Sequence, residues 1–452
     1  MTAHDAPRRA ACDVVLAVEE QSAYANLLLP SLLRERGITG RDAAFATELA
    51  YGTLRFLGSY DAVIAECSAR PLGELDPPLR AALRVGTHQL LGMRVPAHAA
   101  VAATVSVARA MAGHRVAGYA NAVLRKVAGR SRDQWLAAVA PTYEDDPLGH
   151  LAVVHGHPRW IVEVFSEALG GDLDETARAC AADNVAPAVH LVAKPGRCTR
   201  EALLAQLGSG AKAGQWSPYA VAIESGEPGA IEAVRSGAAG VQDEGSQLAA
   251  LAVVHAAVEA EQRWLDVCAG PGGKAALLAG IAETRGATLL ASDIAQHRSL
   301  LTRGAIGPRA GTLVVTADGT RPAWARATFD RVLVDAPCTG LGALRRRPDA
   351  RWRRVPADAD RLHALQVALL DEAATATRPG GVVVYVTCSP HPAETGEVVA
   401  EVLELRGDLA CEPVRGPLAD VPGCDAPYGK QLWPHRHATD AMYVATLRRS
   451  TR

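Results

Sequence analysis

Apolar residues recur at helical spacing through the first 140 positions of the chain. Amphipathic helices are predicted there, for example at Arg8–Glu20, Arg41–Phe56, Tyr60–Ala69, Pro77–Leu91 and Ala97–Met111. The alternation of apolar and polar residues that is typical of strands is absent from this part. We therefore expect residues 1–142 to form an all-helical domain.

Residues 148–240 have a mixed pattern. His157-Pro-Arg-Trp160 begins a predicted helix that ends near Leu169, and a short strand is predicted at Ala188–Ala193. A further helix is expected near Thr199–Gly208, before loops rich in glycine and proline around Ser225–Gly229. These elements predict a small mixed α/β domain between its two neighbours.

Short apolar strands alternate with helices from residue 241 to residue 452. The strands are predicted at Arg263–Val267, Thr288–Ser292, Gly311–Val315, Asp330–Val334, Gly381–Thr387 and Asp440–Leu447. This alternation is typical of a doubly wound parallel sheet. The expected fold is therefore multidomain: an all-α domain, a small α/β domain and a Rossmann-like α/β domain.

Composition limits the possible classes of protein. With 452 residues the chain exceeds a single core, and no apolar run reaches the roughly 18–20 residues that span a bilayer. The first residues lack the apolar core of a signal peptide, so we expect a cytoplasmic protein. Nine cysteines without a CxxC pair predict neither a disulfide framework nor a zinc site.

The charge is unevenly distributed. The net charge is −2, but the first 140 residues hold 16 lysines and arginines against 12 acidic residues. This modest basic bias is compatible with an RNA-binding arm.

A glycine-rich turn follows the first predicted strand of the last domain, in Asp266-Val-Cys-Ala-Gly-Pro-Gly-Gly-Lys274. It is not a P-loop, because Ala275 stands where a serine or threonine would hold magnesium. Gly270, Gly272 and Ala275 match the pattern G-x-G-x-x-A, with Asp293 about 20 positions later, as in nucleoside-cofactor sites. This pattern alone leaves a dehydrogenase and a methyltransferase open.

Two acidic residues end strands at the same predicted edge of the sheet. Asp293 ends the second strand, and Asp318 follows the third. Ligands of open α/β sheets lie beyond the carboxyl ends of the strands. Asp293 therefore suits a ribose diol and Asp318 an adenine amino group, and a solvated loop carboxylate is the alternative for Asp318.

Two cysteines end the fourth and fifth predicted strands: Cys338, in Asp335-Ala-Pro-Cys, and Cys388, in Thr-Cys-Ser. Hydride transfer needs neither thiol, whereas methylation of a pyrimidine at carbon 5 needs a thiolate that adds to carbon 6. That reaction also needs an acid at N3 and a base for the carbon-5 proton. Cys268, inside the glycine turn, more often has a core role.

These motifs together resemble those of the RNA cytosine-5 methyltransferases of the Sun/Fmu/RsmB and NOP2/Sun group. The resemblance implies that Cys388 is the nucleophile and that Cys338 assists product release. DNA cytosine methyltransferases use a Pro-Cys nucleophile instead, so the Thr-Cys-Ser cysteine separates the two groups. The resemblance also implies that Asp335 contacts the target base, that Lys274 lies in the active site and that S-adenosylmethionine is the cofactor. The implied cofactor-binding residues are Cys268, Ala269, Gly270, Pro271, Gly272, Gly273, Lys274, Asp293, Arg298, Asp318 and Asp335.

The resemblance extends over essentially the whole chain. Val241–Gln247, Leu344–Trp352 and Leu432–Tyr443 are similar to further segments of the family, and residues 1–142 resemble a NusB-type RNA-binding domain. This combination implies the bacterial branch that acts on 16S rRNA of the small subunit, as a monomer without metal or membrane partner. The middle domain is expected to link the others and to contact RNA. The same chemistry on another RNA such as tRNA, and a non-enzymatic NusB-like RNA-binding factor, are the alternatives.

Arginines are densest directly after the Cys338 motif. Because their planar groups bind phosphates bidentately, RNA contacts are predicted for Arg345, Arg346, Arg347 and Arg351, with a solvated helix face as the alternative. Trp352 has either a stacking role or a core role. Weaker candidates for RNA contacts in the helical domain are Arg55, Arg84, Arg115, Arg125 and Lys126.

Overall fold

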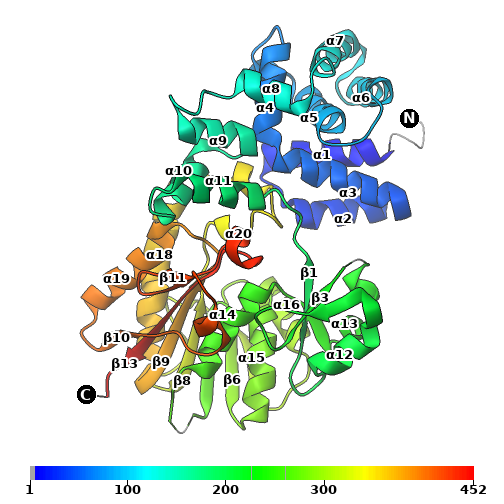
Figure 1. Cartoon of the computed structure of the whole chain (residues 1–452). Helices are drawn as coiled ribbons and strands as arrows, with labels where there is room; N and C mark the ends of the chain where they lie inside the picture. Colours follow the sequence, from blue (N-terminus) through cyan, green and yellow to red (C-terminus); the bar gives the residue numbers. More distant parts are fainter. Residues whose placement is uncertain (1–5, 225, 260, 452) are drawn as a thin grey trace. The chain divides into compact units, whose positions relative to one another are not determined.

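The computed structural model describes residues 6–224, 226–259 and 261–451. They divide into two compact units, which Figure 1 colours along the chain. The helical unit comprises the residues up to Val185 together with Leu344–Val355, and the sheet unit comprises Ala186–Ala343 and the residues from Pro356 onward. The predicted middle segment is thus divided: its first helices, up to Ala182, lie in the first unit, and its strands and remaining helices lie in the second.

The helical unit contains no strand among its described residues, which confirms the all-helical prediction. Helix α5 lies at its centre, since every residue from Leu79 to Gln89 is buried. The other helices pack their apolar faces around it, as the spacing of their apolar residues requires. The helices of this unit are α1 Ala6–Gln21, α2 Ala25–Glu35, α3 Gly40–Arg55, α4 Leu57–Cys67, α5 Pro77–Leu91, α6 Ala97–Ala112, α7 Ala117–Val127, α8 Arg132–Val139, α9 Pro147–His155, α10 Arg159–Ala168, α11 Leu173–Ala182 and α17 Ala350–Arg353.

A small antiparallel sheet begins the sheet unit, with the strand order β2-β3-β1-β4. The predicted strand at Ala188–Ala193 and the predicted helix at Thr199–Gly208 are both present in it, as β1 and α12. The elements are β1 Val189–Ala193, α12 Arg200–Leu207, β2 Ala211–Ala213, β3 Ala220–Ile223, α13 Glu232–Arg235 and β4 Ala239–Val241. Helix α14 (Glu244–His255) then leads into the large sheet.

The large sheet has the strand order β11-β12-β13-β9-β8-β5-β6-β7, and β10 also pairs with β13. All six predicted strands are present. The bounds are β5 Arg263–Asp266, β6 Thr288–Asp293, β7 Thr312–Thr316, β8 Phe329–Asp335, β9 Thr377–Thr387, β10 Leu409–Glu412, β11 Asp425–Ala426, β12 Gly429–Gln431 and β13 Tyr443–Arg449. Strands β5 to β9 pair in parallel, as predicted.

Strand β13 corrects the prediction of a parallel sheet, because it pairs antiparallel with β9 and with β12. It follows β12 after a short segment that holds only the four-residue helix α20 (Pro434–His437). Parallel neighbours need a long crossover connection, whereas a short one suffices for antiparallel neighbours. The sheet is therefore mixed, with a parallel centre and an antiparallel edge.

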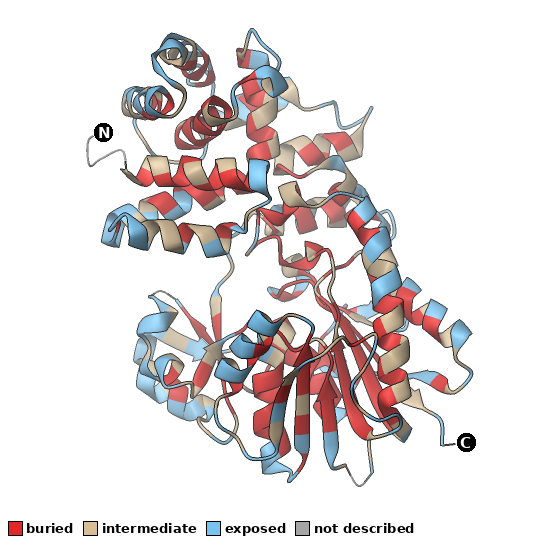
Figure 2. Ribbon diagram, turned by 180° about the vertical axis from the view of Figure 1, so that it is seen from behind, coloured by how far each residue is buried: buried red, intermediate tan, exposed pale blue. Residues whose placement is uncertain are grey.

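Helices cover both faces of this sheet. On one face α14 and α15 (Gly273–Thr284) pack against side chains such as Leu333 and Val384. On the other face α18 (Ala357–Ala376) and α19 (Gly396–Leu405) pack against Val332 and Val383. Figure 2 shows the central strands almost entirely buried, as expected for strands covered on both faces. Helix α16 (Gln296–Ile306) completes the Rossmann-like arrangement, and none of the helices described is long and apolar enough to cross a membrane.

Candidate active site

The two predicted cysteines meet at the carboxyl ends of β8 and β9. These strands pair in parallel with Asp335 opposite Val386, so the loops that leave them start side by side. Cys338 follows the end of β8 and Cys388 follows the end of β9, and their Sγ atoms lie 3.4 Å apart. The structure therefore brings together the two thiols that the sequence placed at one edge.

An ion pair lies beside the thiols. Lys274, in the first turn of α15, donates to Oδ2 of Asp335 at 2.8 Å. Burial disfavours the charge of Lys274, but the negative charges of Asp335 and Cys388 outweigh it and raise the pKa of the ammonium group. Lys274 therefore stays protonated, and its charge stabilises a thiolate at Cys388.

Cys338 has a different environment. Its hydrogen bond with Cys388, its burial and the negative charges of Cys388 and Glu394 together raise the pKa of its thiol well above the usual value. The two sulfurs influence each other in this way, so a charge on one disfavours a charge on the other.

The glycine turn leaves no room for side chains. A Cβ on Gly270 would lie 2.4 Å from Oδ2 of Asp293, and one on Gly272 would lie 2.7 Å from Cα of Thr302. Gly272 also has φ +108°, a conformation that L-residues rarely adopt. These glycines allow Asp293 and helix α16 (Gln296–Ile306) to pack directly against the turn where α15 begins.

The predicted acids border this turn. Asp293 accepts hydrogen bonds from the amides of Gly270 at 3.1 Å and Ala295 at 2.9 Å, and Arg298 binds the carbonyl oxygen of Gly270. Asp318 accepts two bonds from Thr320, both on Oδ1, which lower the pKa of its carboxyl group. Within the described residues these bonds leave Oδ2 of Asp318 available for an amino donor.

Together the glycine turn and the two ordered acids fit a cofactor that carries a ribose and an adenine. Thr320 orders Asp318 within its own turn, and both interpretations of this carboxylate, an adenine contact and a solvated loop residue, stay predictions. Cys268 and Ala269 lie in the same turn, and Ala269 donates to the carbonyl oxygen of Ser292. The predicted cofactor residues therefore lie in the loops at the carboxyl ends of the parallel strands or in the first turns of α15 and α16.

Two buried acids near the site were not predicted from the sequence. Asp266, at the end of β5, is fully buried, and burial followed by repulsion from Asp335 raises the pKa of its carboxyl group well above the usual value. Glu394 is also fully buried and binds the backbone amide of Thr339. In the sequence, only its position six residues after Cys388 places Glu394 near the site. That spacing does not indicate which residues the carboxylate binds.

Two of the four predicted RNA-contacting arginines are buried, which corrects the prediction for them. Arg351 is 0% exposed and binds the backbone oxygens of Arg55 and Asp183 inside the helical unit. Arg345 is also buried, and its own carbonyl oxygen accepts a bond from Arg55. Side chains enclosed in this way are not available to phosphates. Arg346 is half-buried and Arg347 is exposed, so RNA contacts stay predictions for these two.

The weaker candidates in the helical unit divide in the same way. Arg55 is buried, and so is Arg84, which forms ion pairs with Asp61 and Glu19. Trp352 donates from Nε1 to the carbonyl oxygen of Leu54 and packs on the helical core, which supports its core role. The exposed candidates are Arg115, Arg125 and Lys126.

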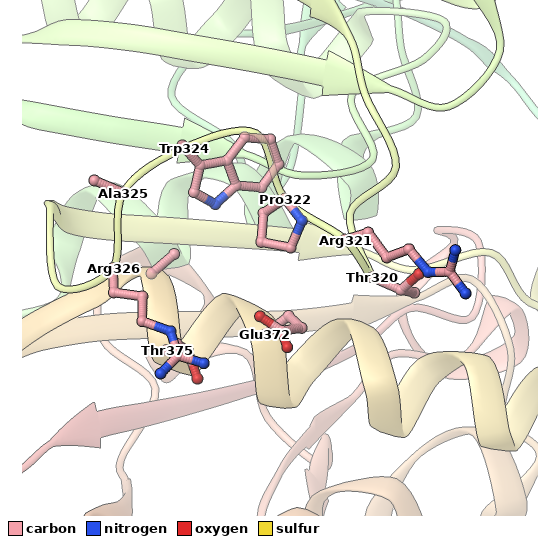
Figure 3. A pocket seen from close by; sticks show the side chains of 9 residues that line it. Thr320, Arg321, Pro322, Trp324, Ala325, Arg326, Glu372 and Thr375 are labelled. Carbon is pink, nitrogen blue, oxygen red and sulfur yellow. The ribbon is translucent and has the colours of Figure 1, made fainter.

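A separate hollow of about 460 Å³ lies on the loop after β7 and on α18. Figure 3 shows Pro322 and Trp324 on the loop, with Glu372 and Thr375 on the helix. None of the predicted site residues lines this hollow, so it is not the site described above.

Comparisons with known proteins agree with this geometry. A family model described as 16S rRNA methyltransferase RsmB/F matches residues 253–448, and one described as the NusB family matches residues 5–129. The putative methyltransferase Rv1407 of Mycobacterium tuberculosis is 50% identical over 99% of this chain and 97% of its own length. The ribosomal RNA small subunit methyltransferase B of Pseudomonas putida is 34% identical over 98% of each chain.

Solved structures share the fold. The crystal structure of PH0851 has a TM-score of 0.81 at 22% identity and covers 99% of this chain and 100% of its own. NSun6 from Pyrococcus horikoshii with SFG has a TM-score of 0.56 at 17% identity and covers 65% of this chain and 98% of its own. With relatives of 34% and 50% identity over nearly the full length, the chain belongs to the family of 16S rRNA methyltransferases RsmB/F, with a NusB domain at its N-terminal side.

Proposed function

We propose that the chain methylates carbon 5 of a cytidine in 16S rRNA through a covalent bond between Cys388 and the base. The proposal depends above all on one observation, the 3.4 Å approach of the Cys338 and Cys388 Sγ atoms beside the Lys274–Asp335 ion pair. A dehydrogenase has no use for this pair of thiols, and a purely RNA-binding protein has no use for an ordered cofactor turn beside them.

The reaction starts at Cys388. With its negative charge stabilised by Lys274, the thiolate adds to carbon 6, so a carbon–sulfur bond forms and an electron pair becomes available at carbon 5. Asp335 contacts the polar edge of the base at N3 and orients it; N3 carries a lone pair, so the proton of this hydrogen bond comes from the carboxyl group of Asp335. The chemistry that S-adenosylmethionine supplies when bound is an electrophilic methyl group for carbon 5.

Cys338 assists the release of the product. While Cys388 is bonded to carbon 6, its charge no longer raises the pKa of Cys338, so Cys338 can lose its own proton to solvent and act as the base. The Cys338 thiolate takes the proton from carbon 5, the electrons of that bond re-form the double bond between carbons 5 and 6, the bond to sulfur breaks and Cys388 departs as a thiolate. The charge of Lys274 interacts with Cys388, which supports Cys388 as the nucleophile. This order of roles agrees with the family resemblance.

The cofactor lies, in this proposal, along the glycine turn. The backbone of Cys268–Lys274 and the side chain of Arg298 form one wall, Asp293 binds the ribose hydroxyls, and Oδ2 of Asp318 accepts from the adenine amino group.

The RNA contacts of the proposal come from the helical unit and from the exposed part of the arginine segment. Arg115, Arg125 and Arg347 are exposed cations suited to phosphates. A protein called ribosomal RNA small subunit methyltransferase B is among the full-length relatives, which favours 16S rRNA over tRNA as the substrate.

The test uses 16S rRNA transcribed in vitro and S-adenosylmethionine with a tritiated methyl group. Cys388→Ala is expected to abolish both methyl transfer and any covalent protein–RNA adduct. Cys338→Ala is expected to accumulate an adduct that survives denaturing electrophoresis. Cys411→Ala, which changes an exposed cysteine, is the matched control and retains full activity.

Methylation that survives Cys388→Ala would show that the nucleophile is misassigned. If the wild-type chain binds this RNA but transfers no methyl group to it, the non-enzymatic alternative is favoured. Bisulfite sequencing of the methylated transcript then identifies the cytidine.

A further inference from the structure

Glu394 is a buried carboxylate that has no role in the steps above. It ends the short helix η7 (Pro392–Glu394), six residues after Cys388, and its side chain is fully buried. An isolated charge in such a place is costly unless hydrogen bonds compensate it. The partners that compensate it therefore indicate what the carboxylate is for.

The carboxylate binds the loop that carries Cys338. The amide of Thr339 donates to Oε1 of Glu394 at 2.7 Å, and the hydroxyl of Thr339 donates to Oε2. Thr339 directly follows Cys338 in the chain. Glu394 thus holds the backbone on the C-terminal side of this cysteine.

A second buried side chain holds the other side. Gln366, on α18, donates from Nε2 to the carbonyl oxygen of Pro337 at 2.8 Å and also to Oε1 of Glu394 at 3.3 Å. Pro337 directly precedes Cys338. Glu394 and Gln366 therefore bind the backbone on both sides of Cys338.

The same network reaches the loop of Cys388. The hydroxyl groups of Thr339 and Ser389 lie 3.2 Å apart, which joins the residues that follow the two cysteines. The amide of Gly342 donates to the carbonyl oxygen of Cys388 at 2.9 Å. The two cysteine loops are thus tied to each other as well as to Glu394.

We propose that Glu394 is a positioning residue for product release, which holds Cys338 beside Cys388 through the backbone of Thr339. The inference rests on the proposed function, because it assumes the roles given to the two cysteines. Glu394 also adds negative charge next to Cys338, which contributes to the raised pKa of that thiol. The carboxylate touches neither the base nor the cofactor in this scheme and acts only through Cys338.

The experiment compares two quantities in a single turnover with 16S rRNA transcribed in vitro: the covalent adduct and the released methylated RNA. Glu394→Ala is expected to form the adduct at a rate close to that of the wild type. The release of methylated RNA by this variant is expected to be about 10-fold to 100-fold slower, since a misplacement of about 1 Å at a reacting group can lower a rate by about 100-fold. Adduct should therefore accumulate as it does with Cys338→Ala.

Two milder variants keep the test open if Glu394→Ala does not fold. Glu394→Gln retains an oxygen for the amide of Thr339 and is expected to restore most of the release rate. Thr339→Val removes only the hydroxyl donor and is expected to slow release by a smaller factor. Glu397→Gln, which changes an exposed carboxylate three residues away, is the matched control and leaves the ratio of adduct to released methylated RNA unchanged.

A folded Glu394→Ala or Thr339→Val variant that releases RNA at the wild-type rate would overturn the inference. So would a variant that slows adduct formation and release equally, because a merely structural role has that effect. If Cys338→Ala itself accumulates no adduct in the same assay, the proposed function fails instead. The two failures are therefore distinguishable.

Discussion

Arg351 provides the sharpest test of what the arginine segment does. Its guanidinium group is enclosed in the helical unit and binds the carbonyl oxygen of Asp183 at 3.0 Å and Oδ1 of Asn184 at 2.8 Å, as well as the carbonyl oxygen of Arg55. Burial, partly offset by the charge of Asp183, lowers the pKa of Arg351 to about 10, so the group is still charged near pH 7. We expect Arg351→Ala to destabilise the helical unit.

The size of the effect follows from the groups left without a partner. Each buried acceptor that loses its donor costs about 1–3 kcal/mol, and removing one member of a buried ionic network costs about 3–5 kcal/mol. The structure has two such buried acceptors around Arg351, the carbonyl oxygens of Arg55 and Asp183, and a part-buried one, Oδ1 of Asn184. We therefore expect a loss of about 3–5 kcal/mol for Arg351→Ala. Arg351→Met is expected to recover only part of it, because methionine restores volume but no donor.

Hydrogen exchange of the full-length protein measures this loss locally. Peptides that cover residues 50–56, 180–185 and 345–355 should lose protection in Arg351→Ala. Arg347→Ala, on the same segment but exposed, should stay within about 0.5 kcal/mol of the wild type. If Arg351→Ala keeps full protection but weakens RNA binding with a smaller salt dependence, Arg351 is a phosphate contact and our reading of its burial is refuted.

Two further predictions concern the cofactor turn and the response to acid. Gly270→Ala places a Cβ 2.4 Å from Oδ2 of Asp293 and 2.7 Å from Cβ of Arg298, and such overpacking costs about 1–3 kcal/mol. The protein should stay folded, and calorimetry should show an affinity for the cofactor that is lower by about tenfold or more. Burial and the nearby charge of Arg132 lower the pKa of His155 to about 4, below its value of about 6.5 in the unfolded chain. The stability that neutral His155 contributes is therefore present above pH 6.5 and is lost as the pH falls toward 4. The melting temperature of His155→Gln should therefore fall less steeply over this range than that of the wild type, and equal slopes would contradict the assignment.

The centre of the sheet unit could be predicted because its signals are local. Strands buried on both faces appear as continuous apolar runs, such as Val382–Val386, and all six predicted strands are present. Parallel strands bring their carboxyl ends to one edge, so the position of Cys338 and Cys388 after two such strands was enough to predict that they meet. The same logic placed Asp293 and Asp318 beside the glycine turn.

The environment of the arginine segment could not be predicted, because its partners lie far away in the sequence. A dense run of arginines is usually solvated, and nothing local distinguishes Arg351 from Arg347. The acceptors that bury Arg351 belong to Arg55, Asp183 and Asn184, between 167 and 296 positions away. For the same reason Glu394 drew no attention, since its partners Thr339 and Gln366 come from two other elements.

The position of the arginine segment, Leu344–Val355, explains why the Cys338 loop needs hydrogen bonds that fix it within the sheet unit. The chain leaves the sheet unit after Ala343, five residues beyond Cys338, and returns to it at Pro356. The loop that carries Cys338 is therefore followed closely by a segment that belongs to the helical unit. The hydrogen bonds from Glu394 and Gln366 fix the loop before the segment Leu344–Val355 begins. Gly342 is fixed in addition by its backbone hydrogen bonds with Cys388 and Ala441. These bonds all lie within the sheet unit, so they keep the geometry of the two thiols independent of the segment that the helical unit holds.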